Sequence, residues 1–169
     1  MLYSCYNNIK IKLARTVYYR NQIMTGGRTN MVKIMVGRKG SGKTKKMIDA
    51  ANDHVRDSHG STIFINNDKR LTRELNYRMR VVCAEDYQQL GNIDEFTGFI
   101  LGIISSDHDI DTIFIDSITK HANISLDNIS VFIDRLDAIS KQYEVEFIVS
   151  VSAEAEEIQG ILETHEVLN

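Results

Sequence analysis

Short apolar runs and stretches with helical spacing alternate along the chain from Met31 onward. The apolar runs favour buried strands, which we predict at Met31–Val36, Thr62–Ile65, Arg80–Cys83, Thr112–Ile115 and Val145–Val151. Helical spacing predicts a helix over Lys43–Val55 and three more, marked by Phe96–Ile104 with Asp94 as N-cap, by Ile129–Ile139, and by Glu154, Glu156 and Glu157. Strands that alternate with helices form a parallel sheet covered on both faces. The pattern therefore predicts one α/β domain over residues 31–169, with a five-stranded parallel sheet.

The first 30 residues differ in charge from the rest of the chain. Of the 20 basic and 23 acidic side chains in the sequence, residues 1–30 carry five basic and no acidic ones, namely Lys10, Lys12, Arg15, Arg20 and Arg28. This basic leader has neither the apolar centre of a signal peptide nor a sustained period. Codons for Thr25-Gly26-Gly27 can contain a ribosome-binding sequence, and Met31 follows shortly afterwards. We therefore expect residues 1–30 to be translated upstream sequence and Met31 to be the native start.

Cysteine usage and hydrophobicity narrow the class of protein. Cys5 and Cys83 form no zinc-ligand spacing, and two isolated cysteines suit a reduced, cytoplasmic chain. The five histidines are scattered, so their spacing argues for no metal site. The longest apolar stretch, Phe96–Ile104, is far too short to span a bilayer. We expect a cytoplasmic protein without a membrane span.

One glycine-rich segment carries the strongest chemical signal in the sequence. It matches the P-loop pattern G-x-x-x-x-G-K-[ST] in full, and its residues are Gly37, Arg38, Lys39, Gly40, Ser41, Gly42, Lys43 and Thr44. The glycines let the backbone curl so that its N–H groups point at phosphates, and the start of the following helix adds the positive end of its dipole. We expect Lys43 to reach the β- and γ-phosphates of a nucleotide and the Thr44 hydroxyl to ligate Mg²⁺.

A second motif lies further along the chain, where the predicted strand Thr112–Ile115 ends at Asp116. This position places a carboxylate at the carboxyl edge of a parallel sheet, beside the phosphate loop. Asp116 and Thr44 are therefore the candidate Mg²⁺ ligands, and the two motifs form a Walker A and Walker B pair. The guanine-recognition motif Asn-Lys-x-Asp is missing from the sequence after Asp116. The sequence thus predicts ATP and Mg²⁺ as ligands.

Asp116-Ser117 resembles the Walker B segment of RecA-type ATPases, in which Asp-Ser closes the strand. The resemblance extends from Met31 to about residue 153 and implies a catalytic carboxylate after the second strand, where Asp68 stands in place of a glutamate. It also implies a polar γ-phosphate sensor on the fifth strand, where Ser150 or Ser152 stands. Asp68 would orient a water in line with the γ-phosphate, and its short side chain predicts slow turnover. The alternative is that Asp68 belongs to a turn.

From Met31 to its end the chain is also similar to a group of small, single-domain bacterial ATP-binding proteins. Some members of that group are labelled as twitching-motility or secretion ATPase-like. This second resemblance implies ATP binding and does not imply pilus retraction.

Three functions remain open at this point. We favour a slow, Mg²⁺-dependent ATPase of RecA-like type that uses ATP turnover to change its own shape or that of a partner. We expect that partner to be another protein or a second copy of this chain. The alternatives are a nucleotide-dependent binding module without significant hydrolysis and a small-molecule or nucleoside kinase. A basic group follows the second predicted strand and contains Lys69, Arg70, Arg73, Arg78 and Arg80. We interpret it as a solvated, positively charged helix face, and the alternatives are a kinase lid, an arginine finger or a nucleic-acid contact.

Overall fold

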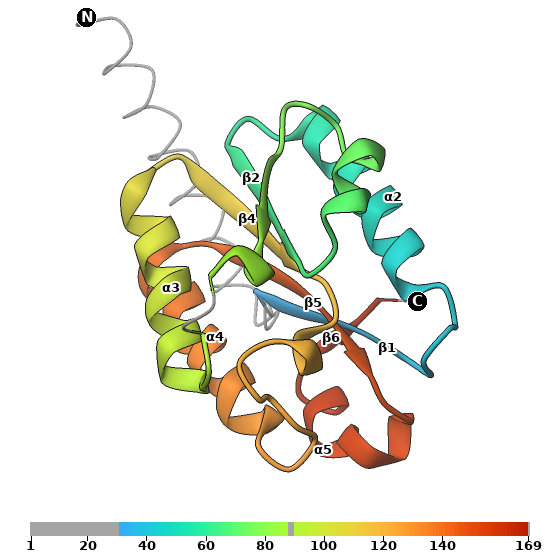
Figure 1. Cartoon of the computed structure of the whole chain (residues 1–169). Helices are drawn as coiled ribbons and strands as arrows, with labels where there is room; N and C mark the ends of the chain where they lie inside the picture. The colour runs from blue at the N-terminus through green and yellow to red at the C-terminus, as the bar shows by residue number, and fades with distance from the viewer. Residues whose placement is uncertain (1–30, 88–89, 169) are drawn as a thin grey trace, which may run out of the picture. The chain divides into compact units, whose positions relative to one another are not determined.

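The computed structural model describes residues 31–87 and 90–168, which form alternating strands and helices (Figure 1). The strands are β1 (Val32–Gly37), β2 (Ser61–Asn66), β3 (Arg80–Cys83), β4 (Ile110–Ile115), β5 (Glu146–Ser152) and β6 (Glu166–Val167). The α-helices are α2 (Lys43–Asp57), α3 (Ile93–Ser106), α4 (Ile129–Tyr143) and α5 (Gln159–Leu162). Short 3₁₀ turns are η1 (Lys69–Glu74), η2 (Ala84–Asp86), η3 (Ile118–Lys120) and η4 (Ala155–Ile158). The leader, residues 1–30, lies outside the described residues, so its origin stays a prediction.

The strands form one six-stranded sheet in the order β3-β2-β4-β5-β1-β6, and every pairing in it is parallel. The α/β class and the parallel sheet are confirmed. The predicted count of five strands was wrong by one, because the two-residue strand β6 pairs with β1 through Lys33 and Ile34. A strand this short carries no period that a sequence pattern can detect.

The predicted helices are present, but two of their details differ from expectation. The N-cap of α3 is Asn92, whose side chain accepts a hydrogen bond from the Glu95 N–H at 2.9 Å, so the N-cap assignment to Asp94 was wrong. Asp94 lies in the first turn instead, where an acid suits the helix dipole. The acidic group near the C-terminus opens η4 through a capping box between Glu154 and Glu157, and the helix that follows has only four residues.

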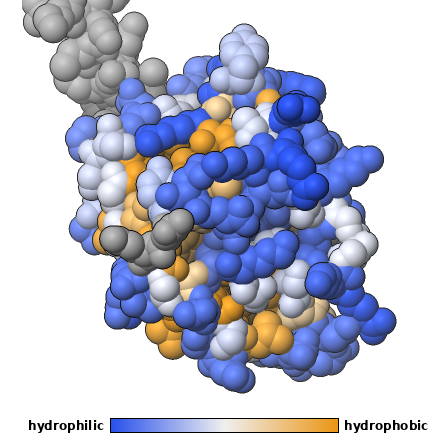
Figure 2. Space-filling view, viewed as in Figure 1, coloured by the Kyte–Doolittle hydropathy of each residue, from blue (hydrophilic) through white to orange (hydrophobic). Residues whose placement is uncertain are grey.

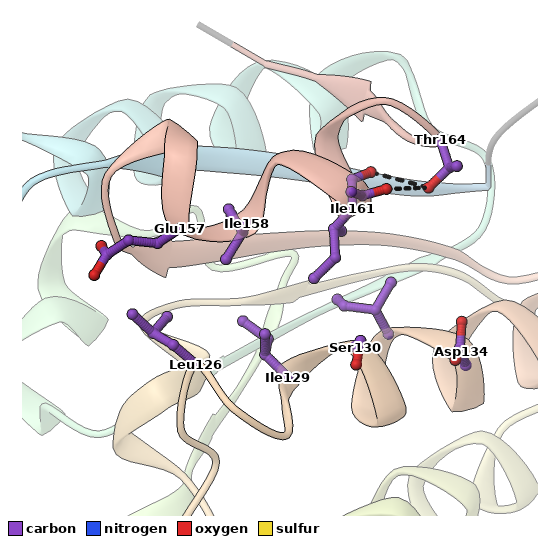
Figure 3. Close-up of a pocket in the computed structure, with 10 residues that line it drawn as sticks. Leu126, Ile129, Ser130, Asp134, Glu157, Ile158, Ile161 and Thr164 are labelled. Atoms are coloured by element: carbon purple, nitrogen blue, oxygen red, sulfur yellow. Dashed lines mark hydrogen bonds between the residues drawn. The ribbon is translucent and has the colours of Figure 1, made fainter.

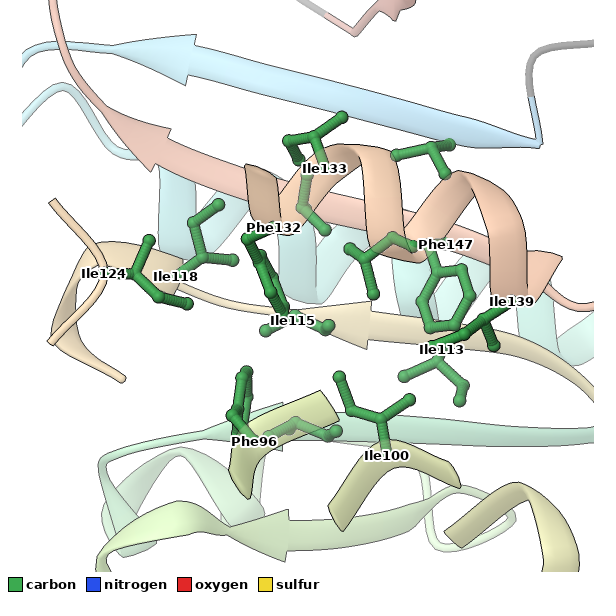
Figure 4. Close-up of a cluster of buried hydrophobic side chains, with 14 of the residues drawn as sticks. Phe96, Ile100, Ile113, Ile115, Ile118, Ile124, Phe132, Ile133, Ile139 and Phe147 are labelled. Carbon is green, nitrogen blue, oxygen red and sulfur yellow. The ribbon is translucent and has the colours of Figure 1, made fainter. Parts of the chain in front are cut away.

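Helices cover the sheet on both faces, and each face has its own apolar core. In Figure 1, α3 and α4 lie together on one side of the sheet and α2 lies on the other. The core under α3 and α4 is shown in Figure 4 and includes Phe96, Ile100, Ile113, Ile115, Phe132 and Phe147. The core under α2 includes Met47, Ala51, Phe64, Phe114 and Ile148. Successive residues of a strand point to opposite faces, which explains why Ile113 and Phe114 belong to different cores.

The face of the molecule in Figure 2 is mostly hydrophilic, with smaller hydrophobic areas between the polar side chains. Among the described residues, no helix is long and apolar enough to cross a membrane.

Because all strands run the same way, their carboxyl ends meet at one edge of the sheet. The loops after β1, β2, β4 and β5 leave from this edge. In a parallel α/β sheet this edge is where ligands commonly bind.

Candidate functional site

The loop between β1 and α2 has the geometry of an anion cradle. Gly40 and Gly42 both have φ of 85°, in the left-handed region that residues with a side chain rarely adopt. Gly42 is also the N-cap of the 15-residue helix α2, where no side chain caps the helix. The first N–H groups of a helix have no partner within the helix, so at this end they can bind an anion such as phosphate.

Lys43 begins α2 and points back into the loop. Its Nζ donates hydrogen bonds to the carbonyl oxygens of Gly37 at 2.6 Å and Arg38 at 2.8 Å, and only 7% of the residue is exposed. Burial lowers the pKa of Lys43; the negative charge of Asp116 opposes the shift, and the positive charge of Lys120 adds to it. The loop therefore holds a buried ammonium group close to the N-terminus of α2.

Thr44 and Asp116 bring the two sequence motifs into direct contact. The Thr44 hydroxyl donates to Asp116 Oδ2 at 3.0 Å, across 72 residues of sequence. Mg²⁺ prefers oxygen ligands and is commonly held by one or two protein groups together with phosphate and water. The adjacent hydroxyl and carboxylate beside the Gly37–Thr44 loop fit that requirement.

Ser150 holds the other oxygen of the same carboxylate. Its hydroxyl donates to Asp116 Oδ1 at 2.7 Å and accepts from the Ser117 N–H at 2.6 Å, and Ser150 is fully buried. A hydroxyl has one hydrogen to donate, and here Asp116 receives it. Ser150 therefore orients Asp116, while Ser152 lies beside Gly37, where the phosphate loop begins.

His121 contacts the backbone of Asp116, and sequence reasoning missed it. Its Nε2 donates to the Asp116 carbonyl oxygen at 2.9 Å, and its ring stacks on Phe96 at a centroid distance of 5.1 Å. Burial lowers the pKa of His121, and because a carbonyl oxygen can only accept, Nε2 is the ring nitrogen that carries a hydrogen. A single histidine in a chain with scattered histidines gives no spacing signal that would have revealed this contact.

Asp68 follows β2 and is held by its own segment. Its carboxylate accepts from the backbone N–H of Arg70 at 2.9 Å, which caps η1, and it forms a two-pronged ion pair with the Arg70 guanidinium. Hydrogen bonds from Arg70 lower the pKa of Asp68 to about 2. Lys120, which sequence reasoning also missed, lies close enough to influence the pKa values of Asp68 and Lys43.

The remaining basic side chains of the predicted site are exposed and partly paired. Arg38 forms an ion pair with Glu154 at 2.5 Å, and Lys39 is exposed. In the basic group after β2, Lys69 pairs with Asp86 and Arg80 bonds the Ser106 hydroxyl at 3.3 Å. Because η1 contains Lys69, Arg70 and Arg73 while Arg80 belongs to β3, the basic side chains after β2 do not form one continuous helix face.

A groove of about 320 Å³ lies between α4 and the segment η4–α5 (Figure 3), and no residue of the Gly37–Thr44 loop lines it. Ile129 of α4 lies on one wall of the groove, and Ile161 of α5 lies on the opposite wall. The residues that line this groove include the acids Asp134 and Glu157 and no lysine or arginine. That lining does not suit a polyphosphate.

No group of three or more His, Cys, Asp or Glu side chains within residues 31–87 and 90–168 is arranged to hold a metal ion. A comparison of the sequence with protein-family models found no match. A search among curated proteins found none either.

Proposed function

We propose that this protein binds ATP with Mg²⁺ at the β1–α2 loop and hydrolyses it slowly, as a P-loop ATPase of RecA-like type. The observation that carries the proposal is the 3.0 Å hydrogen bond between Thr44 and Asp116, the two candidate Mg²⁺ ligands. A strand-to-helix glycine turn without a nucleotide role has no need of this contact, nor of the buried Lys43 beside it.

The binding roles follow from the geometry of the loop. Backbone N–H groups at the start of α2 would bind phosphate oxygens, with Gly40 and Gly42 allowing the chain to curve around them. Lys43 would exchange its two carbonyl partners for the β- and γ-phosphates. Bound Mg²⁺ would neutralise charge on the phosphates. Ser150 keeps the Asp116 carboxylate oriented for that ion.

Sheet order supports the RecA-like part of the proposal. Strand β5 lies between β1, which leads into the phosphate loop, and β4, which Asp116 directly follows. This order places Ser150 and Ser152 between the two motifs, where the resemblance to RecA-type proteins expects a sensor strand. The preference for adenine rests on the missing guanine motif, and competition of ATP against GTP for binding tests it.

The decisive experiment measures binding of a fluorescent ATP analogue to the wild type and to Lys43→Ala. We expect the affinity of Lys43→Ala to fall by about 10-fold or more, because a charge-assisted contact to phosphate is lost. Lys141→Ala, which removes a lysine from the exposed end of α4, should bind as the wild type does. Asp116→Asn should keep nucleotide binding but weaken its dependence on Mg²⁺. Equal affinities for wild type and Lys43→Ala would refute the proposal.

A second candidate function is nucleotide-dependent binding of a partner without significant hydrolysis. The observation in its favour is that Arg70 holds Asp68, the predicted catalytic carboxylate, in a two-pronged ion pair. Steady-state phosphate release, measured with and without single-stranded DNA, separates the two functions. The catalytic role of Asp68 stays a prediction until Asp68→Asn is assayed.

A further inference from the structure

Asn66 ends β2 at the same level of the sheet as Asp116. Ile65 of β2 pairs with Ile115 of β4, and the Asp116 N–H donates to the Ile65 carbonyl at 2.9 Å. The next residue on each strand is therefore Asn66 on β2 and Asp116 on β4. Neighbouring strands lie about 4.8 Å apart, so the two side chains start from adjacent positions.

Both side chains point to the face of the sheet that carries α2. Phe64, two residues before Asn66, and Phe114, two residues before Asp116, both belong to the core under α2. Side chains two residues apart on a strand share a face. The contact between Thr44 of α2 and Asp116 confirms that face for Asp116. The Asn66 amide thus lies on the phosphate-loop side of the sheet, in the row that also contains Ser150.

The Asn66 amide is buried and has no hydrogen-bond partner among residues 31–87 and 90–168. Its exposed fraction is 0%, and neither Oδ1 nor Nδ2 makes a hydrogen bond. Buried polar groups are normally paired, so an unpaired amide at a ligand edge indicates a ligand or water as its partner. The two residues that follow are already engaged: Asn67 donates to the Lys120 carbonyl at 3.0 Å, and Asp68 pairs with Arg70.

We propose that the Asn66 side chain contacts the reacting groups of ATP, with Oδ1 accepting a hydrogen bond from the attacking water and Nδ2 donating to a γ-phosphate oxygen. This inference rests on the proposed function and deepens it, because it moves the water-orienting role from Asp68 to Asn66. An amide can orient the attacking water in nucleotide hydrolysis, as a glutamine does in some P-loop NTPases.

The chemistry balances without a base on the protein. The water oxygen forms a bond to the γ-phosphorus while the bond from that phosphorus to the β–γ bridging oxygen breaks. The electron pair of the broken bond leaves with ADP. An uncharged amide does not take up a proton, so the water proton passes to a γ-phosphate oxygen and leaves with inorganic phosphate. Hydrolysis that lacks a general base is slow, which agrees with the proposed slow turnover.

The test compares Asn66→Ala with Thr62→Val. Thr62 is a matched control because it lies on the same strand and the same face, is 1% exposed, and has a buried hydroxyl without a partner. It differs in position, since it lies four residues earlier on β2, about 13 Å from the carboxyl edge. Three quantities are measured for each protein: Tm without nucleotide, Kd for Mg·ADP, and kcat for phosphate release.

We expect Asn66→Ala to keep the wild-type Tm and the wild-type Kd for Mg·ADP, because its amide bonds neither the protein nor the first two phosphates. Its kcat should fall by about 10-fold or more, which is the loss expected when a group that stabilises the transition state is removed. Thr62→Val should keep the wild-type Tm, Kd and kcat.

The remaining outcomes also decide the matter. A wild-type kcat in Asn66→Ala overturns the inference, and if Asp68→Asn loses turnover instead, the water belongs to Asp68. If Asn66→Ala lowers both the Tm and the affinity for Mg·ADP, the Asn66 amide supports the folded structure, and the inference is overturned as well. A wild type that binds Mg·ATP but releases no phosphate overturns the inference and leaves nucleotide binding intact. A wild type that binds no ATP overturns the proposed function itself.

Discussion

Ser150→Ala removes a single oxygen atom, and we expect it to destabilise the protein strongly because that atom makes two buried hydrogen bonds. The Ser150 hydroxyl donates to the ionised Asp116 carboxylate at 2.7 Å and accepts from the Ser117 N–H at 2.6 Å. Losing a hydrogen bond to a charged group costs about 1.5–3 kcal/mol, and leaving a buried N–H without a partner costs about 1–3 kcal/mol. These two costs overlap, so we expect the free energy of unfolding to fall by about 3 kcal/mol.

Ser140→Ala is the matched control for this measurement. Ser140 is also fully buried, but its hydroxyl makes one neutral hydrogen bond, to the Val145 carbonyl at 2.7 Å. We expect Ser140→Ala to cost about 1 kcal/mol. Both variants should remain folded, because domains of this size are commonly stable by about 5–15 kcal/mol.

Equilibrium unfolding in urea gives the free energy of unfolding for the wild type and both variants. The reasoning requires Ser150→Ala to lose more than Ser140→Ala by at least about 1 kcal/mol. Equal losses for the two variants would show that the Ser150 contacts to Asp116 and Ser117 contribute no more than one neutral hydrogen bond. That result would refute the account of Ser150 as the residue that orients Asp116.

Three further predictions address local features of the fold. Glu144→Gly should raise the free energy of unfolding by about 0.5–1 kcal/mol, because Glu144 caps the end of α4 with φ of 56°, a conformation that glycine adopts without strain. Thermal unfolding of the wild type and the variant measures this difference. Gly60→Ala should destabilise by about 1–3 kcal/mol in urea, because an added Cβ would lie 2.5 Å from Asp111 Oδ2 and 2.7 Å from the Asp109 carbonyl oxygen. Arg70 lowers the pKa of Asp68 to about 2, below its unfolded value of 3.8, so the carboxylate contributes stability above about pH 4 that is lost as the pH falls through 2. The stability difference between wild type and Asp68→Asn should therefore be present at pH 7 and vanish near pH 2, and an unchanged difference at pH 2 would contradict this assignment.

Local patterns in the sequence determined most of the fold. Each strand except β6 and each of the three long helices has an apolar pattern of its own, and the two strand faces follow from a period of two. The Gly37–Thr44 loop could also be predicted, because its eight residues are contiguous and the sequence patterns of the strand before it and the helix after it adjoin it directly. The N-cap of α3 was misplaced because Asn92 and Asp94 are both good capping residues, and the choice between them depends on the entry of the chain into the helix.

Tertiary structure decided which side chains surround Asp116. Thr44 and Ser150 contact it from 72 and 34 residues away, and only strand order brings them there, since β5 lies between β1 and β4. The sequence predicted Asp68 as the water-orienting residue, because the resemblance to RecA-type ATPases implies a carboxylate after the second strand. Strand register instead places Asn66 beside Asp116. Asp68 lies two residues beyond the end of β2, where it caps η1 and pairs with Arg70. A strand pattern specifies which face a residue takes, but the neighbour it meets depends on pairing between strands that are distant in sequence.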